Sequence, residues 1–266
     1  ICNSLIILLL TAIFIYNNSK NIVLSTIYFM TFYHFFNAFN ISRQYISVMI
    51  IANSIIFLKN KKTRAYLFTC IIATLIHNTA IVSLFLLPLS KITLDKYNIK
   101  KILKVVLIII IACILFLDIL IKYFIMLFPH YKLYFESTVA NFYNAGQGRK
   151  IIITYIYILL FIVSQKIIKE HNLKNDDEQN FLILHIINFI AIIIGFASLQ
   201  SILIARIECY FSIFVIIFIP NILYYLNKYK DLYILSSIYI LFIPMYIQLS
   251  SNMAGVLKYT SWIFEK

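Results

Sequence analysis

Charged residues are scarce in this sequence. They make up 12% of it, whereas 62% of its residues are hydrophobic. A soluble domain carries about 25% charged and roughly 45–50% apolar residues, because a single core cannot bury a larger apolar share of the chain. The composition therefore excludes a soluble domain and predicts a protein embedded in a lipid bilayer.

Several catalytic motifs are also absent. The sequence has no P-loop, no HExxH or GxSxG motif, and no Asp-x-Asp pair that could hold the metal of a nucleotide sugar. Its cysteines lie singly within apolar runs, without the spacing of a metal or redox site. These absences disfavour chemistry driven by ATP or by a nucleotide sugar, and we expect no cofactor.

The net charge of +13 comes from Lys and Arg residues in short clusters between apolar runs. Nucleic-acid binding would need a solvated basic face, which this arrangement does not provide. Short basic clusters are instead typical of membrane orientation, because cytoplasmic loops collect Lys and Arg. We therefore expect no nucleic-acid partner and place the chain in the bacterial plasma (inner) membrane.

Long apolar runs predict the membrane segments. Helices are expected, because each backbone polar group in lipid must be satisfied within its own segment. The sequence predicts an all-α polytopic transmembrane helical bundle of about 8–10 segments, forming one domain over 1–266 with an outer loop at 122–150. Because Ile1 already lies in an apolar run, we also expect a missing N-terminal part. The expected segments are 1–16, 21–38, 44–58, 65–89, 102–121, 151–168, 181–204, 209–226 and 232–249.

The run at 65–89 holds His77 and Asn78 in its middle. It is either one span or two half-helices, 65–77 and 79–89, that form a hairpin with His77 at the tip. The hairpin puts most Lys and Arg residues on one side of the membrane, whereas a single span divides them almost equally. The positive-inside rule favours the hairpin. Irregular backbone at membrane depth lines a cavity or is buried in protein, so the hairpin also indicates a site.

Three arginines, Arg43, Arg149 and Arg206, then face outward at the ends of spans. Lysine is far more abundant than arginine in this chain, so arginine on the side that is normally poor in positive charge is unusual. A guanidinium group grips phosphate through two parallel hydrogen bonds and stays charged at any pH. We expect these arginines to bind a phosphorylated substrate, with snorkelling to the interface as the alternative.

A polar stripe runs along the start of the third expected segment. On a continuous helix, Asn40, Arg43, Ser47 and Ser54 would share one face. Such a stripe faces a bundle interior or a wet cavity, which predicts substrate binding by Asn40 and Arg43. Hydrogen bonding between helices by the Asn and Ser side chains is the alternative.

Two residues are candidates for a catalytic base. His77 lies at membrane depth, and its imidazole could take a proton from a sugar hydroxyl, donate to a phosphate, or serve as a buried structural group. Glu208 lies beside Arg206 and Tyr210, which are four residues apart and share a helix face. Its carboxylate could act as the base or pair with an arginine as a structural group.

The order of these residues resembles the EpsG-type exopolysaccharide polymerases, relatives of the Wzy-type O-antigen polymerases. The likeness rests on the strings FNAFNISRQYISVMI, KNKKTR and IATLIHNTAIVSLFLLPL, where Asn-x-x-Arg-Gln opens a span and a histidine follows in a later run. A further string, IARIECYFSIFVIIFIP, is similar to the family's second arginine region. The resemblance implies substrate binding by Asn40, Arg43, Gln44, Arg206 and Tyr210.

This resemblance implies a membrane glycosyltransferase that joins oligosaccharide repeat units carried on undecaprenyl pyrophosphate at the outer face of the membrane. The product would be O-antigen, capsule or exopolysaccharide, made without a metal. The implied partners are the lipid-linked oligosaccharide, membrane lipids, a chain-length regulator and a repeat-unit flippase. Two alternatives remain at this point: a transporter or flippase of lipid-linked oligosaccharide, and a membrane acyltransferase acting on polysaccharide.

Overall fold

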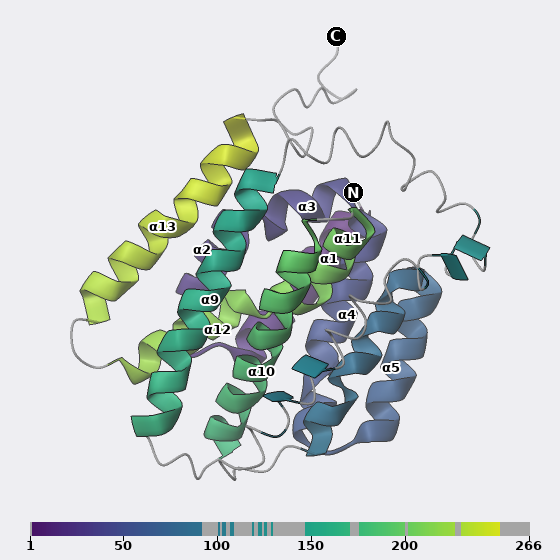
Figure 1. The fold of residues 1–266 in the computed structure, drawn as a ribbon, viewed down its shortest axis with the longest axis horizontal. Coiled ribbons are helices and arrows are strands. Elements are labelled where there is room, and N and C mark those ends of the chain that lie inside the picture. The colour runs from purple at the N-terminus through teal and green to yellow at the C-terminus, as the bar shows by residue number, and fades with distance from the viewer. Residues whose placement is uncertain are drawn as a thin grey trace.

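The structure is a computed structural model whose described residues form a bundle of helices (Figure 1). The expected all-α class is confirmed. The expected span at 102–121 and most of the expected outer loop at 122–150 lie outside the described residues. The described residues are 2–91, 147–170, 176–199, 202–226 and 230–250, with isolated residues between 101 and 129.

The helices follow the apolar runs, because a helix satisfies its own backbone while its aliphatic side chains face lipid or neighbouring helices. Many large apolar side chains, such as Leu5 and Leu75, are exposed on the outside of the bundle, as a lipid-facing surface requires. The helices are α1 (Cys2–Asn18), α2 (Ile22–Thr31), α3 (His34–Asn40), α4 (Ser42–Lys59), α5 (Thr63–Ile76), the 3₁₀ helix η1 (Asn78–Lys91), α9 (Gln147–Glu170), α10 (Asp176–Ala197), α11 (Ile202–Ser212), α12 (Val215–Tyr225) and α13 (Lys230–Ser250).

Within the described residues, three stretches are long and apolar enough to cross a membrane: Lys150–Glu170, Gln179–Ala197 and Ile204–Tyr225. The bent pair α2 and α3 adds a fourth if it counts as one span. The chain is therefore a multi-pass membrane protein. The expected boundary between 204 and 209 was wrong, because these residues lie inside α11; α10 ends at Ala197 and α11 begins at Ile202.

The expected span at 21–38 is not one straight helix. α2 ends at Thr31, α3 begins at His34, and their axes are inclined by 56°. Tyr33, between them, has a φ of 72°, a left-handed conformation that is costly for a residue with a side chain. Its hydroxyl donates to Ser212 Oγ at 3.0 Å, a tertiary contact that helps to offset this cost. The apolar pattern of the sequence gives no sign of the break.

The run at 65–89 reverses direction as the hairpin expectation requires. α5 ends at Ile76, His77 has extended backbone (φ −150°, ψ 118°), and η1 packs back along α5. The Tyr66 hydroxyl donates to Ser83 O at 2.8 Å and joins the two arms. The reversal is confirmed, and it places His77 at the tip of the hairpin.

Polar contacts join the ends of α1, α4 and α12 at one end of the bundle. Lys59 Nζ donates to Asn18 Oδ1 at 2.7 Å, and the backbone N–H of Lys20 donates to Asn221 Oδ1 at 2.9 Å. α4 runs from the opposite end of the bundle to this one, and α5 runs back to the opposite end. The start of α4 and the hairpin tip therefore lie together at the opposite end.

Candidate functional site

Three elements that are far apart in the sequence meet at this opposite end: the start of α4, the hairpin tip and α11. Gln44 Nε2 on α4 donates to the backbone oxygen of Arg206 on α11 at 2.6 Å. Ser47, almost one turn further along α4, donates to Ala73 O near the end of α5 at 2.9 Å. These two bonds hold the start of α4 against both of its neighbours, α11 and α5.

His77 lies at the centre of this junction. Its Nδ1 is 2.7 Å from Thr79 Oγ1, which is in turn 3.2 Å from the Tyr210 hydroxyl on α11. Thr79 and Tyr210 are buried, whereas His77 is partly exposed. His77 Nε2 has no hydrogen-bond partner among the described residues and is not among the enclosed polar atoms. Nε2 is therefore the nitrogen that a ligand can reach.

The charges of Arg206 and Arg43 both act on His77. His77 lies in the break between α5 and η1, outside the spanning helices, and its pKa is lowered to about 4, first by burial and then by these two charges. Arg206 is half-buried, whereas Arg43 is exposed and forms no hydrogen bond or ion pair with the described residues. Arg43, His77, Thr79, Arg206 and Tyr210 are referred to below as the arginine–histidine cluster.

Two residues expected to bind substrate lie behind the surface of the cluster. Gln44 is 1% exposed and Tyr210 is 0% exposed. Gln44 holds Arg206 through its backbone, and Tyr210 faces Thr79. In these buried positions, Gln44 supports Arg206 and Tyr210 supports Thr79, instead of contacting a substrate themselves. Gln44 Oε1 is buried without a hydrogen-bond partner in the described part of the chain.

The expected polar stripe through Asn40 is interrupted. Asn40 is the last residue of α3, Ile41 leaves helical geometry (φ −119°, ψ 51°), and α4 begins at Ser42. Asn40 and Arg43 therefore do not lie on one continuous helix, and that expectation was wrong because one non-helical residue rotates the chain between them. Arg149 lies in the first turn of α9, and its side chain is outside the described ones.

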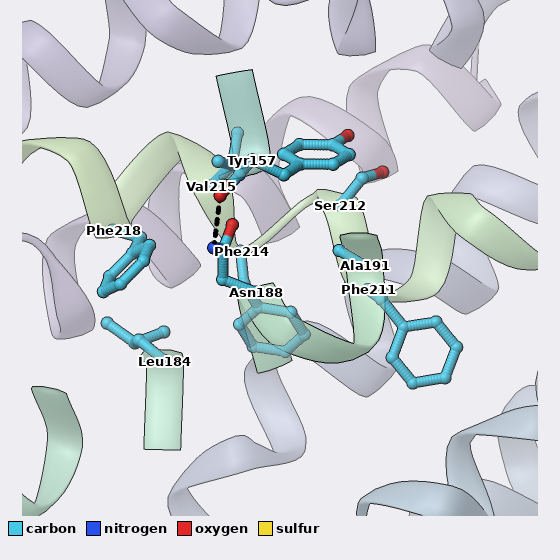
Figure 2. Close-up of a pocket in the computed structure, with 9 residues that line it drawn as sticks. All are labelled: Tyr157, Leu184, Asn188, Ala191, Phe211, Ser212, Phe214, Val215 and Phe218. Carbon is cyan, nitrogen blue, oxygen red and sulfur yellow. Dashed lines mark hydrogen bonds between the residues drawn. The ribbon is translucent and has the colours of Figure 1, made fainter. Parts of the chain in front are cut away.

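Glu208 lies in a second polar group within the bundle. Its side chain is 6% exposed, and its Oε1 accepts from Tyr157 at 3.2 Å. The Tyr33 hydroxyl, which donates to Ser212, lies 3.5 Å from the same oxygen. Figure 2 shows the hydroxyls of Tyr157 and Ser212 on the same side, away from Asn188, whose Nδ2 donates to Tyr157 O at 2.9 Å. The space that these residues line is too small to hold a water molecule.

His34 extends this second group to α3 and α4. Its Nδ1 lies 2.7 Å from the Tyr45 hydroxyl, and its Nε2 lies 3.2 Å from Ser212 O. Because a carbonyl oxygen only accepts, Nε2 carries the proton and Tyr45 donates to Nδ1. The bond from Nε2 satisfies the carbonyl of Ser212, the last residue of α11. The residues of this tyrosine–glutamate cluster are Tyr33, His34, Tyr45, Tyr157, Glu208 and Ser212.

The two clusters use different faces of α11. Arg206 and Tyr210 face the hairpin region, whereas Glu208, two residues after Arg206, lies on roughly the opposite side of the helix. The sequence reasoning missed Tyr33 and Tyr157, because the chain has 20 tyrosines and these two follow no motif. The only available signal was that a buried carboxylate needs hydrogen-bond donors.

Two cations and an accessible imidazole nitrogen at one end of a membrane bundle suit an anionic substrate. In the described part of the chain, no three His, Cys, Asp or Glu side chains are grouped as metal ligands. The model of the EpsG family matches residues 1–261.

The chain belongs to the EpsG family. The resemblance seen in the sequence is thereby confirmed over nearly the whole chain. The EpsG family is a family of polysaccharide polymerases, which supports a membrane enzyme of polysaccharide biosynthesis. No curated protein and no solved structure gives a significant match.

Proposed function

We propose that this chain polymerises oligosaccharide repeat units carried on undecaprenyl pyrophosphate, by glycosyl transfer at the outer face of the bacterial inner membrane. The observation that carries the proposal is the meeting of Arg43, Arg206 and His77 at one end of the bundle. The family supplies the reaction class. The product is O-antigen, capsule or exopolysaccharide, and a repeat-unit flippase and a chain-length regulator act alongside the enzyme.

The two arginines hold the leaving group. Negative charge grows on the departing pyrophosphate as the bond to the sugar breaks, and guanidinium groups already in place stabilise that charge. Arg43 is exposed, whereas the Arg206 backbone is fixed by Gln44. Arginine suits this role better than lysine, because its planar fork binds two phosphate oxygens at once.

His77 is the general base. The acceptor hydroxyl oxygen attacks the anomeric carbon of the donor sugar, and the bond from that carbon to pyrophosphate breaks with its electron pair leaving on pyrophosphate. His77 Nε2 takes the hydroxyl proton, for which the imidazole must be neutral. Burial and the two arginines keep it neutral. Glu208 is not the base in this scheme, because tyrosines and apolar packing enclose its carboxyl group.

Purified protein in lipid vesicles tests the proposal. Given repeat units on undecaprenyl pyrophosphate, it should make longer glycans and release undecaprenyl pyrophosphate, and Arg43→Ala protein should not. Failure of wild-type protein to lengthen the glycan would refute the polymerase. Movement of the intact donor across the vesicle without joining would indicate a flippase instead.

The outer-face orientation has a separate test. Single cysteines in place of Lys62 and Lys96, in a background without native thiols, should be shielded from a membrane-impermeant reagent added outside. A cysteine in place of Asn40, which is exposed at the end of α3 just before α4 begins, should react and serves as the positive control. Reaction at positions 62 and 96 with protection at position 40 would reverse the orientation and contradict an outer-face site.

A further inference from the structure

A chain of hydrogen bonds leads from His77 into the bundle. It runs from His77 Nδ1 to Thr79 Oγ1 and on to the Tyr210 hydroxyl, over 2.7 and 3.2 Å. A helical threonine commonly returns its hydroxyl to the carbonyl one turn earlier, as Thr74 does to Cys70 O at 2.7 Å. Thr79 is the second residue of η1, so its own helix offers no carbonyl one turn earlier, and its hydroxyl contacts His77 and Tyr210 instead. The break in the hairpin therefore leaves the Thr79 hydroxyl available to link these two side chains.

The chain can be polarised in two directions, because each hydroxyl both donates and accepts. In the first, His77 Nδ1–H donates to Thr79, Thr79 donates to Tyr210, and Nε2 keeps its lone pair. In the second, Tyr210 donates to Thr79, Thr79 donates to Nδ1, and Nε2 carries the proton. Only the first direction lets Nε2 accept a proton from a substrate.

We propose that Thr79 and Tyr210 are positioning residues that hold His77 in the tautomer with its proton on Nδ1 and its lone pair on Nε2. This rests on the proposed function, in which Nε2 receives the proton of the acceptor hydroxyl. As that proton arrives, the Thr79 oxygen accepts from Nδ1–H and supports the imidazolium that forms. A carboxylate has this role in serine-protease triads, and here a neutral hydroxyl has it.

A neutral partner fits the charges of this site. A carboxylate behind His77 would lie close to Arg206 and Arg43, whose charges both act on the imidazole. It would therefore offset part of the positive charge that an anionic leaving group needs. Thr79 and Tyr210 orient the ring without that loss, since both are uncharged and buried.

The tautomer can be measured without substrate, by ¹⁵N NMR of protein labelled in its histidines. The His77 signals are those that disappear in His77→Gln. We expect the proton on Nδ1 in wild type and in Thr79→Ser, and a loss of this preference in Thr79→Val, which keeps the shape but removes the hydroxyl. A proton on Nε2 in wild type overturns the proposal.

Turnover provides a second test of the positioning role. Thr79→Val should lower kcat by about 10–100-fold, as losses of the outer partner of a functional histidine do at metal sites, with KM nearly unchanged. Thr79→Ser should recover most of the rate, and Tyr210→Phe should lower kcat in the same sense. Thr74→Val is the matched control, because it is the same change in the same hairpin and its hydroxyl is satisfied within its own helix. Wild-type kcat in folded Thr79→Val overturns the proposal.

The two hypotheses fail separately. If the Nδ1–H tautomer is present and depends on Thr79, but wild-type protein makes no polymer in vesicles, the positioning role stands and the polymerase proposal falls. If wild-type protein polymerises but His77 carries its proton on Nε2, the polymerase proposal stands and the positioning role falls.

Discussion

The two polar clusters of this bundle differ in how much hydrogen-bonding capacity they leave unused. In the arginine–histidine cluster, Arg43 is exposed and His77 Nε2 has no partner in the described part of the chain. In the tyrosine–glutamate cluster, Glu208 accepts from Tyr157 and both nitrogens of His34 are bonded. The arginine–histidine cluster is therefore an open cluster, whose unused capacity can bind a ligand. The tyrosine–glutamate cluster is a closed cluster, which stabilises the fold.

The closed cluster supports irregular helices. Tyr33 lies at the break between α2 and α3, and Ser212 precedes the turn between α11 and α12. His34 and Tyr33 both bond to Ser212, so the two irregular points support each other. Backbone groups freed at such points in a membrane need protein partners, because lipid offers none. The comparison therefore predicts loss of activity from changes in one cluster and loss of stability from changes in the other.

Within this comparison, the largest expected difference between two matched variants comes from removing a guanidinium in the open cluster. Arg43→Ala or Arg206→Ala should lower turnover by about 10²–10³-fold, the range for losing one donor that stabilises developing negative charge. Arg43→Lys should recover little, because an ammonium group lacks the bidentate fork. Polymer length in cells and turnover of purified protein measure the effect.

Arg64→Ala is the matched control for Arg43→Ala. Arg64 is also exposed, but it lies near the start of α5, at the other end of the bundle. Its loss should leave polymer length unchanged. Full-length polymer from Arg43→Ala cells, with normal amounts of protein in the membrane, would show that the open cluster does not bind the leaving group.

A smaller effect on turnover, with a clear effect on stability, is expected at Glu208. Glu208→Ala leaves the Tyr157 hydroxyl without its buried acceptor, at a cost of about 1–3 kcal/mol. Glu208→Gln keeps an acceptor oxygen and should be milder. Thermal unfolding in detergent should show this order, and turnover per folded molecule should stay near wild type for Glu208→Gln. A loss of turnover in stable Glu208→Gln protein would make Glu208 catalytic after all.

The smallest predicted effect is a shift between two pH profiles. A base must be unprotonated, so the rate falls as pH drops through the pKa of His77. For kcat/KM, which reports the free enzyme, this fall should lie near the lowered pKa of about 4. For kcat it should lie higher, because bound pyrophosphate offsets the charges of Arg206 and Arg43. A fall in kcat at lower pH than the fall in kcat/KM would contradict binding of an anion beside His77.

The sequence predicted the open cluster better than the closed one, for physical reasons. Basic residues follow the positive-inside rule, so their distribution predicted the hairpin and the position of His77. An arginine that binds phosphate is a distinctive residue, and Arg43 and Arg206 could be singled out by type. The link between Thr79 and Tyr210 was not visible, because it depends on how η1 packs against α11.

Breaks without glycine or proline were beyond prediction. Tyr33 has a positive φ within an aromatic run, and Ile41 leaves the helix between two polar residues. Local propensity gives neither position a reason to stop a helix, and the tertiary contact of the Tyr33 hydroxyl with Ser212 helps to hold the first of them. For the same reason, the prediction that Asn40 and Arg43 share one helix face was wrong, although the prediction of the hairpin was confirmed.

Turnover and donor binding of purified His77→Gln and His77→Ala protein test the central claim most directly. If His77 is the base at the open cluster, both variants should lose about 10²–10⁴-fold in the chemical step, while binding of the lipid-linked donor stays nearly unchanged. High activity in His77→Gln alone would mean that His77 only donates a hydrogen bond, because an amide still donates. Wild-type turnover per folded molecule in both variants would contradict any direct role of His77.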